Sequence, residues 1–525
     1  MTLISRIRFM DTIAPRDLKE LKEAADKGEP EAAYSLGKLH ESGDGVDQNF
    51  ELAFQYIEEA AKSNHLKAVH DLGVMYFNGA GVERDVEKAT KLYLKAASGG
   101  SGLSSYCLGL NEELGANGKV DISLAIVWYL IACAQSNFEA RKRILSLSPG
   151  LSKSDCERII QTLKDLSEHG FTWAQVALAD QYLIGEFTPV NYQTSFDLHQ
   201  SAANKGITFS KERLGTFFLE GLGIEKNLEN GVRYLTEAAE EGNPDAQARL
   251  AYLYLNGIGV EIDQKLASDL FILSAEQGNM NAINDLGNMY EKGIYFPQDL
   301  VKAFNCYQMA ANMGSSISIF NLSRLYGVGF DGLPKDEVKA FEYLKNAADA
   351  GCPEAQLNIG LKYFWGNEIQ KDIQKSVEYL SQAADAGQIT AMGHLGLMYQ
   401  KGDGVDLNPL KGFELIKYAA EHGDSGSLNN LGWAYLEGIG TEPNKNLAFS
   451  NFFKAANLGH TTAQVNLANC YENGWGTVVN LLDAYKWFSV AVHHGFDAKK
   501  SIEILSEKLT SQQILEAERF VSEWA

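Results

Sequence analysis

Apolar residues recur along this chain with one long period. Its marker is a Leu, usually followed by Gly, that first stands at Leu36. The same dipeptide or a close relative recurs at Leu72, Leu108, Leu178, Leu214, Leu250, Leu286, Leu322, Ile359, Leu395, Leu431 and Leu467. The intervals are 36 residues, apart from one of 37 near 330–334 and one of 70 that contains a 34-residue insertion. The pattern predicts an array of twelve repeats.

The residues around each marker predict a first helix. A small residue stands four positions before it and Tyr stands four after it in nine repeats, so all three lie on one stripe of a helix. Gly stands seven positions after the marker in all twelve repeats, from Gly43 to Gly474. Gly adopts the left-handed conformation that ends a helix at little steric cost. We therefore expect each first helix to end at this Gly.

A second helix is expected to follow in each repeat. A second Gly two positions further on, as in Gly79-Ala80-Gly81, lets the chain reverse. Asn117, Phe187 and Tyr295 stand in its place in repeats 3, 4 and 7, and it is missing from repeats 8 and 9, so differently shaped turns are expected there. The second helix often carries a small residue at marker +17 and Ala-Ala at +24 and +25, with Gly at +28 in ten repeats. Each repeat is thus a predicted helical hairpin.

One hairpin cannot bury its apolar stripe alone, whereas stacked hairpins form a continuous core. The predicted fold is all-α, a right-handed α/α superhelix (solenoid) of about twelve 36-residue helical hairpins. Ala24, Ala25 and Gly28 match the end of a second helix, so residues 14–28, with Pro15 in the first turn, are expected to cap the N-terminal end.

The insertion resembles the end of the chain. The segment from Phe138 aligns without gaps with the segment from Phe496, and both place a Ser or Thr three residues before a side chain that can cap in return. The expected organisation is an N-terminal helix with repeats 1–3 (1–136), an inserted helical pair (137–170), repeats 4–12 (171–495) and C-terminal capping helices (496–525). Two alternatives remain for the insertion: a hinge near 165–175 between two arms, or two helices that pack into the stack.

The recurring string Leu-Gly-x-x-Tyr-x-x-Gly-x-Gly-Val, followed by Lys-Ala and Ala-Ala-x-x-Gly, resembles the Sel1-like repeat family, which is related to the tetratricopeptide repeats. The repeat from Leu72 is close to a consensus copy. The resemblance implies a bacterial protein that binds other proteins, since relatives are signalling adaptors, virulence or host-contact factors, or immunity proteins that neutralise a toxin. Cysteine-rich relatives join their hairpins by disulfides. Only Cys107 and Cys133 share a hairpin here, so this property is not transferred.

The charge narrows the choice of partner. Lys and Arg number 46 and Asp and Glu number 68, which gives a net charge of -22. A surface this acidic repels phosphate backbones and anionic lipids, and it favours a basic partner. No stretch reaches the roughly 18 apolar residues of a membrane span. Without a recognisable signal peptide, we expect a cytoplasmic protein with six free thiols; secretion without a cleaved signal stays open.

Signatures of catalysis are missing from the sequence. There is no H-E-x-x-H and no Gly-Lys-Ser/Thr phosphate loop, so no cofactor, no metal and no enzymatic activity are expected. His65, His422, His460 and His494 are expected to complement the carbonyls at the ends of second helices. An active site in 137–170, where only His169 lies near Cys156, is a third and weaker class of function.

The expected binding surface is the face of the first helices opposite the apolar stripe, at marker positions -2, -1, +2, +5 and +6. Amides there can hydrogen-bond an extended backbone, and apolar side chains between them can anchor it. The candidate residues are Asn321, Asn358, Leu361, Phe364, His394, Leu397, Asn430, Trp433, Asn466 and Asn469. The predicted function is a non-catalytic scaffold that binds a protein or peptide in a concave groove. The alternative functions are an immunity protein that neutralises a toxin, or a virulence or host-contact factor. For each candidate residue, the alternative role is simple packing on the next helix.

Overall fold

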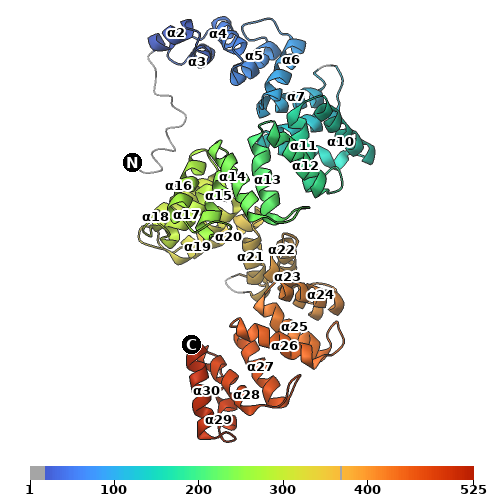
Figure 1. The fold of residues 1–525 in the computed structure, drawn as a ribbon, viewed down its shortest axis with the longest axis vertical. Coiled ribbons are helices and arrows are strands. Elements are labelled where there is room, and N and C mark those ends of the chain that lie inside the picture. The colour runs from blue at the N-terminus through green and yellow to red at the C-terminus, as the bar shows by residue number, and fades with distance from the viewer. Residues whose placement is uncertain (1–17, 117, 367–368, 525) are drawn as a thin grey trace. The chain divides into compact units, whose positions relative to one another are not determined.

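The computed structural model describes residues 18–116, 118–366 and 369–524. Within these ranges the regular elements are α-helices and one short 3₁₀ turn, and the one strand-like feature is an isolated bridge between Phe330 and Leu333 (Figure 1). The chain is a helical solenoid, as predicted. It divides into two units, residues up to Ala282 and residues from Ile283, and each is described separately.

Each repeat is a pair of 13-residue helices. The first helices are α3 (Pro30–Ser42), α5 (Leu66–Asn78), α7 (Gly102–Leu114), α11 (Thr172–Ile184), α13 (Thr208–Glu220), α15 (Pro244–Asn256), α17 (Met280–Lys292), α19 (Ser316–Val328), α21 (Pro353–Trp365), α23 (Ile389–Lys401), α25 (Ser425–Glu437) and α27 (Thr461–Asn473). The second helices are α4 (Phe50–Lys62), α6 (Val86–Ser98), α8 (Ile122–Ala134), α12 (Tyr192–Asn204), α14 (Leu228–Glu240), α16 (Gln264–Glu276), α18 (Leu300–Asn312), α20 (Glu337–Asp349), α22 (Ile373–Asp385), α24 (Pro409–Glu421), α26 (Lys445–Asn457) and α28 (Leu481–His493).

The predicted helix ends are confirmed, and the structure adds a signal that the sequence analysis missed. All twelve Gly residues at marker +7 have a positive φ. An Asn or Asp begins every second helix, at marker +13 in eleven repeats and at +14 in repeat 8, which has the extra residue; its side chain accepts a backbone N–H of the first turn. The backbone N–H of the same residue donates to the carbonyl at marker +4, as from Asp85 to Tyr76 at 2.9 Å. One residue thus starts the second helix and holds it against the first.

The second turn Gly has a further role besides the expected reversal of the chain, for which Gly81 has a positive φ of 70°. A Cβ on Gly81 would lie 2.0 Å from the carbonyl oxygen of Phe50, at the start of the preceding repeat's second helix. This Gly therefore allows close contact between consecutive repeats. The expectation of a different turn at Tyr295 is wrong, because Tyr295 keeps a left-handed φ of 62°. Asn117 and residues 367–368 lie outside the described residues, so the turns expected there are not described.

Aromatic contacts join consecutive repeats. An aromatic ring at marker +18 meets the ring at +4 of the next repeat edge to face, with interplanar angles of 87° for Phe54 and Tyr76 and 84° for Phe413 and Tyr435. Their centroids are 5.4 and 5.5 Å apart. Such pairs add to the stability gained by burial alone. The Tyr stripe seen in the sequence is therefore part of the contact between repeats.

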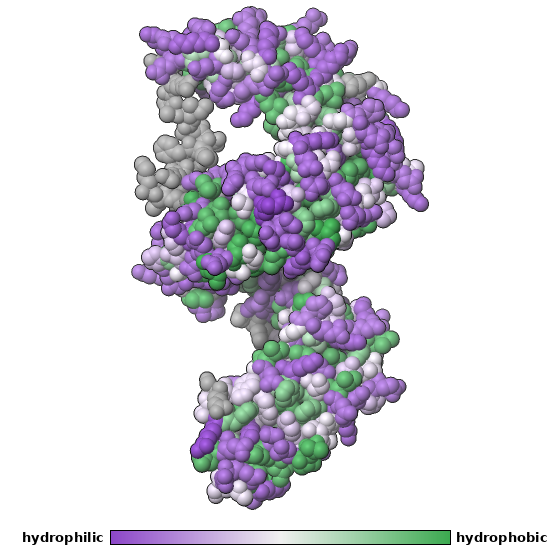
Figure 2. Space-filling view, in the orientation of Figure 1, coloured by the Kyte–Doolittle hydropathy of each residue, from purple (hydrophilic) through white to green (hydrophobic). Residues whose placement is uncertain are grey.

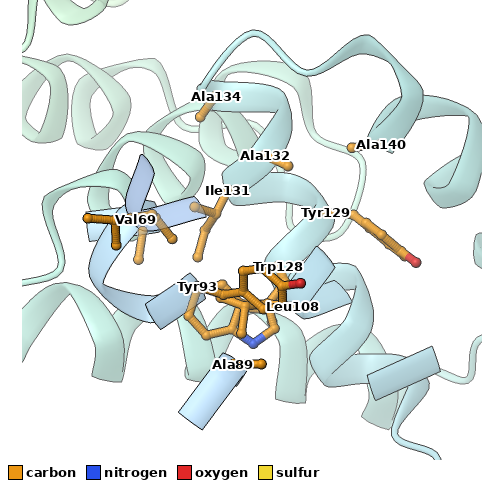
Figure 3. Close-up of a cluster of buried hydrophobic side chains, with 14 of the residues drawn as sticks. Val69, Ala89, Tyr93, Leu108, Trp128, Tyr129, Ile131, Ala132, Ala134 and Ala140 are labelled. Atoms are coloured by element: carbon orange, nitrogen blue, oxygen red, sulfur yellow. The ribbon is translucent and has the colours of Figure 1, made fainter. Parts of the chain in front are cut away.

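The core of the first unit runs through the insertion. α2 (Leu18–Asp26) packs on α3, as expected for an N-terminal cap, while residues 14–17 lie outside the described residues. One cluster of buried side chains extends from Ala25 to Ala202 and includes Ile144 and Leu163 of the insertion. Figure 3 shows part of this cluster, with Trp128, Tyr93 and Leu108 labelled in one region of the view and the Tyr129 ring pointing away from them.

The inserted helices α9 (Phe138–Leu147) and α10 (Lys153–Glu168) both pack on α8, and α10 also packs on α11. Buried residues on both sides of 165–175, Leu163 and Ala174, belong to the same cluster. The predicted reciprocal cap is confirmed: the Asp155 N–H donates to the Ser152 hydroxyl, and the Ser152 N–H donates to the Asp155 carboxylate at 2.9 Å.

The C-terminal helices repeat this arrangement in the second unit. α29 (Lys499–Ser506) and α30 (Ser511–Trp524) pack on α28. Trp487 of α28 lies against Phe520 and Trp524 of α30, with ring centroids 5.8 and 5.1 Å away. The expected capping pair is present, because the Thr510 N–H donates to the Gln513 side chain at 2.9 Å.

Candidate functional site

Two residues of the predicted amide row are buried between repeats of the second unit. Asn321 and Asn466 are each 7% exposed. The Asn321 amide donates to the Asn284 side chain at 3.0 Å, and the Asn466 amide donates to Asn429 at 2.8 Å. Each bond joins position -1 of one repeat to position -2 of the repeat before it. These two amides therefore hold the stack together and are not available to a partner.

The other amides of the row are more accessible. Asn358 is exposed, and its side chain donates to the Glu354 carbonyl of its own helix at 2.7 Å. Asn430 and Asn469 are half-buried. The Asn358 amide keeps one N–H and its oxygen for other contacts, since an amide side chain offers two donors and two acceptor sites.

Three of the apolar candidate residues pack on neighbouring side chains, and the fourth, Trp433, is partly exposed. Leu361 and Phe364 are half-buried against Leu380 and its neighbours. These contacts agree with the alternative that the two side chains simply pack within the stack. Leu397 is likewise half-buried, against the cluster that contains Leu431. Trp433 is 38% exposed, and its ring meets Phe452 edge to face at 5.8 Å. Trp433 is thus a supported aromatic side chain that presents a large surface to solvent.

His394, at position -1 of its repeat, is half-buried. Burial lowers the pKa of its imidazole, although the Asp424 carboxylate acts in the opposite direction. The ring is therefore neutral near pH 7 and offers one donor and one acceptor.

An open hollow of about 340 Å³ lies beside Asn358, between α19, α20 and α21. Its lining residues are Phe320, Ser323, Arg324, Gly327, Lys335, Glu337, Ala340, Phe341, Leu344, Asn358 and Lys362. Phe320, Phe341 and Leu344 provide apolar surface, and Leu344 is 4% exposed. Its polar side chains are Arg324, Lys335, Lys362, Glu337, Ser323 and Asn358.

The absence of one side chain opens this hollow. Position +5 of the first helix carries Glu, Phe, Leu or Gln in the other eleven repeats, but Gly327 stands there in repeat 8. A Cβ on Gly327 would touch only the Ala340 methyl, at 3.7 Å. The turn that follows contains the extra residue of the 37-residue interval and is closed by the Phe330–Leu333 bridge.

The charges around the hollow are held by ion pairs. Arg324 donates to both carboxylate oxygens of Glu291, at 2.7 and 2.8 Å. Glu291 also accepts the Tyr307 hydroxyl at 2.6 Å. Lys335 lies 2.7 Å from Glu337, and this contact lowers the pKa of the Glu337 carboxyl. Arg324 and Lys335 are therefore already paired with carboxylates of this chain.

Further exposed apolar residues were missed in the sequence analysis. Val328 and Trp365, both at position +6, are 79% and 62% exposed. The Trp365 ring meets Phe364 at 4.8 Å. The +6 position was named as part of the open face, so a search of that column for apolar residues would have found both.

The second helices carry a separate apolar hollow of about 550 Å³ between α24, α25 and α26. Phe453 and Leu458, which line it, are 42% and 58% exposed. Figure 2 shows hydrophobic side chains among hydrophilic ones on this part of the second unit. An apolar surface of this kind is therefore not confined to the first helices.

An active site in the insertion was one of the functions considered above. The polar side chains around its hollow instead make contacts that support the fold. A hollow of about 500 Å³ there is lined by Asp121, Ser123, Asp155 and Arg158 among others. Arg158 pairs with Asp121, and the Ser123 hydroxyl donates to Asp155 at 3.3 Å. Hydrogen bonds from Ser152 lower the pKa of Asp155. These groups fasten α10 to the preceding repeat.

The thiols and histidines are also explained by structure. All six cysteines are free, as expected, and burial raises the pKa of Cys107, Cys133 and Cys306 to about 11. Two histidines differ from the expectation: His65 and His460 begin first helices, where each ring nitrogen accepts a backbone N–H at 3.2 Å.

In the described ranges no three His, Cys, Asp or Glu residues are placed to hold a metal ion. Over the same residues no helix is both long and apolar enough to cross a membrane.

Comparison with family models decides the classification. The Sel1 repeat model matches residues 30–65, 66–101, 106–137, 174–207, 210–243, 244–279, 281–315, 316–352, 353–388, 389–424, 425–460 and 461–496. The chain belongs to the Sel1 repeat family. This confirms the resemblance and places the chain in a family of repeats typical of protein–protein interaction. No curated protein matches the chain.

Solved structures include other Sel1 repeat proteins from bacteria. A protective antigen of uropathogenic Escherichia coli is 26% identical, with 97% of this chain and 94% of the antigen covered and a TM-score of 0.42. A Sel1 repeat protein from Oxalobacter formigenes is 29% identical over 59% of this chain and 89% of its own, with a TM-score of 0.38. An immunity protein from Pseudomonas aeruginosa is 20% identical over 41% and 81%, with a TM-score of 0.31.

Proposed function

We propose that this Sel1 repeat protein is a non-catalytic scaffold that binds a partner protein or peptide on the first-helix face of repeats 8–12. The observation that carries the proposal is Trp433, a large aromatic side chain that stays 38% exposed although Phe452 supports it. Aromatic side chains in such positions dominate the binding energy of many protein interfaces. Asn358 and Asn430 on the same face supply amides for a partner backbone.

The packing alternative accounts for part of the predicted set. Asn321 and Asn466 are bonded between repeats, and Leu361, Phe364 and Leu397 have packing partners in the stack. The proposed contact surface therefore keeps Asn358, His394, Asn430, Trp433 and Asn469. The half-buried apolar residues form its base.

The test uses the full chain as bait in lysate of the cell that carries the gene, followed by mass spectrometry. In one variant Asn358, Asn430 and Trp433 are changed together to Ala. In a control variant Phe453, Asn457 and Leu458 of the second-helix hollow are changed to Ala, since they offer a comparable surface elsewhere. We expect the first variant, with unchanged helicity, to lose a partner that the control retains. Equal capture by both variants would contradict the proposal.

The identity of the partner would then specify the role. A basic secreted toxin whose activity is blocked by the chain would define an immunity protein. A host protein would define a host-contact factor, and a bacterial signalling protein would define an adaptor. Because the chain carries a net charge of -22, electrostatic attraction would speed association with a basic toxin.

A further inference from the structure

The first-helix face loses its charges in repeats 9–11. Positions -2, -1, +2 and +5 together carry at least one Asp, Glu, Lys or Arg in each of repeats 1–8 and again in repeat 12. In repeats 9–11 these positions carry none, and we call them the uncharged surface. Charged side chains border it, with Lys362 in the hollow beside Asn358 and with Lys401 and Glu437 at the ends of α23 and α25. The net charge of -22 is thus carried elsewhere on the chain.

Three polar side chains of the uncharged surface stand at position -1 of consecutive repeats. They are Asn358, His394 and Asn430. Position -2 of the preceding repeat holds a residue without a polar side chain in each case, namely Phe320, Leu357 and Gly393. In the part of the chain that the structure describes, no hydrogen bond from the preceding repeat reaches any of the three, in contrast to Asn321 and Asn466. Three consecutive repeats therefore each offer one polar side chain to a ligand.

The spacing of the repeats favours one conformation of that ligand. Packed helices lie about 8–10 Å apart. α23 and α25 are in such contact, since a Cβ on Gly393 would lie 2.1 Å from the Ser427 hydroxyl. A polyproline II segment completes one turn in three residues and rises about 9 Å in that turn. Every third residue of such a segment therefore meets the next repeat in the same orientation, whereas a β-strand returns to the same face after two residues and about 7 Å.

The chemistry of the surface favours the same ligand. A helix also repeats after about 10.5 Å, or seven residues, but its backbone groups are already hydrogen-bonded to one another. The polyproline II backbone has no internal hydrogen bonds, so its carbonyls can accept from amide and imidazole N–H groups. A charge on the ligand would lose its hydration here without an opposite charge beneath it. Proline fits these conditions, because it is uncharged, apolar and has no backbone N–H to satisfy.

We propose that the uncharged surface binds a proline-rich, uncharged partner segment in the polyproline II conformation, with an apolar residue at every third position. Its carbonyls accept hydrogen bonds from the Asn358 and Asn430 amides and the His394 imidazole. Its apolar residues lie on the side chains at position +2, of which Trp433 is 38% exposed, and aromatic side chains commonly line grooves that bind such segments. This inference rests on the proposed function and specifies the conformation and chemistry of the segment bound.

The experiment is a selection on phage of random peptides of about twelve residues, long enough to span three repeats, against the immobilised full chain. Fluorescence anisotropy then measures the affinity of the enriched peptides. We expect a shared core without charged residues and with Pro or another apolar residue at every third position. Inserting one Ala in the middle of this core should weaken binding about tenfold, while inserting one complete three-residue period should change it by less than about twofold. Only the single insertion breaks the period.

Matched variants of the protein locate the site. Asn358→Asp removes an amide donor and adds a charge to the uncharged surface, so it should weaken binding about tenfold. Asn473→Asp is the control, because Asn473 is also exposed and also donates to the carbonyl four residues before it, but it stands at position +6 of repeat 12. The control should bind within about twofold of wild type. An about tenfold rise in salt should likewise change wild-type binding by less than about twofold, since no ion pair contributes.

The outcomes distinguish this inference from the proposed function. Enriched peptides that lose binding with Trp433→Ala but tolerate the single insertion would overturn the polyproline II conformation and leave the scaffold function standing. Enriched peptides with charged cores, equal binding by Asn358→Asp and Asn473→Asp, or a selection that enriches nothing would also overturn the inference. Circular dichroism shows that the helices of each variant are intact. The capture experiment described above tests the scaffold function independently of these peptides.

Discussion

The junction between repeats 8 and 9 and the junction between repeats 11 and 12 have similar sequences and different surfaces. Both place an Asn at position -1 of the later repeat, Asn358 in one and Asn466 in the other. Asn466 is buried against Asn429, whereas Asn358 is exposed beside the hollow. At position +5, Leu436 is packed at the 11–12 junction and Gly327 leaves the 8–9 junction open.

The difference in exposure between Asn358 and Asn466 depends on a pair of residues in consecutive repeats, called the diagonal pair below. Position -2 of one repeat and position -1 of the next, 37 residues apart in these cases, form polar pairs in both units: Tyr34 with Asp71, Glu212 with Arg249, Asn284 with Asn321 and Asn429 with Asn466. At the 8–9 junction, Phe320 stands at position -2 and offers no polar partner. An amide on this face is therefore available to a partner only where the preceding repeat does not bond it.

The largest expected contrast in stability concerns two glycines. A Cβ on Gly432 would lie 2.6 Å from the Phe452 ring, so Gly432→Ala should destabilise α25 and its neighbours by about 1–3 kcal/mol. Gly327→Ala meets no such obstacle and should stabilise α19 by about 0.5 kcal/mol, because Ala favours a helix over Gly. Hydrogen exchange measured by mass spectrometry over each helix gives both values. Equal effects of the two substitutions would contradict the description of the two junctions.

The next contrast concerns the two amides. Asn429→Ala leaves the buried Asn466 amide without its acceptor and should destabilise the 11–12 junction by about 1–3 kcal/mol. Asn358→Ala should change stability by less than about 0.5 kcal/mol, because the residue is exposed. Urea unfolding followed by circular dichroism measures the difference. Replacing Asn429 and Asn466 together should cost less than the sum of the single changes, and strict additivity would show that the pair is not coupled.

The two junctions should respond alike to the loss of a helix cap. Asp336 begins α20 and Asn444 begins α26, and each side chain accepts a backbone N–H at 2.9–3.0 Å. Asp336→Ala and Asn444→Ala should each cost about 1 kcal/mol. The same hydrogen-exchange measurement, read over α20 and α26, checks this. A large difference between them would mean that the cap is not the common element of the repeats.

The smallest effect on stability is expected from a rim charge of the hollow. Lys335 is 57% exposed in its pair with Glu337. Lys335→Glu should therefore change the free energy of unfolding by less than about 0.5 kcal/mol. Thermal unfolding of the variant measures this. A loss of several kcal/mol would contradict the description of Lys335 as an exposed charge in a weak surface ion pair.

The repeat period was enough to predict the fold, because the spacing of Leu, Tyr, Ala and Gly reflects packing that recurs in every hairpin. The Asn or Asp at marker +13 was equally visible in the sequence and was missed because the apolar columns were followed first. The contact of Gly81 with Phe50 was not predictable in the same way, since it joins two repeats through backbone atoms whose distance the sequence does not contain.

The candidate site was predicted less well, for the same reason. The residues at one marker position, compared over all repeats, show which side chains face away from the apolar stripe. The exposure of Asn321 and Asn466, however, depends on a partner in the preceding repeat. The hollow depends on a missing side chain at Gly327 and on the longer turn after it, and three helices must be placed before that space has a volume. Comparing columns across neighbouring repeats would have indicated the diagonal pairs but not the hollow.

Photocrosslinking from two positions tests the central claim most directly. A photoreactive phenylalanine analogue replaces either Trp433 on the first-helix face or Phe453 on the second-helix face, residues that are 38% and 42% exposed. Each variant is expressed in the cell that carries the gene and irradiated there. Our account predicts a discrete crosslinked partner from position 433 and none from position 453. Crosslinking from position 453 with none from position 433 would contradict it.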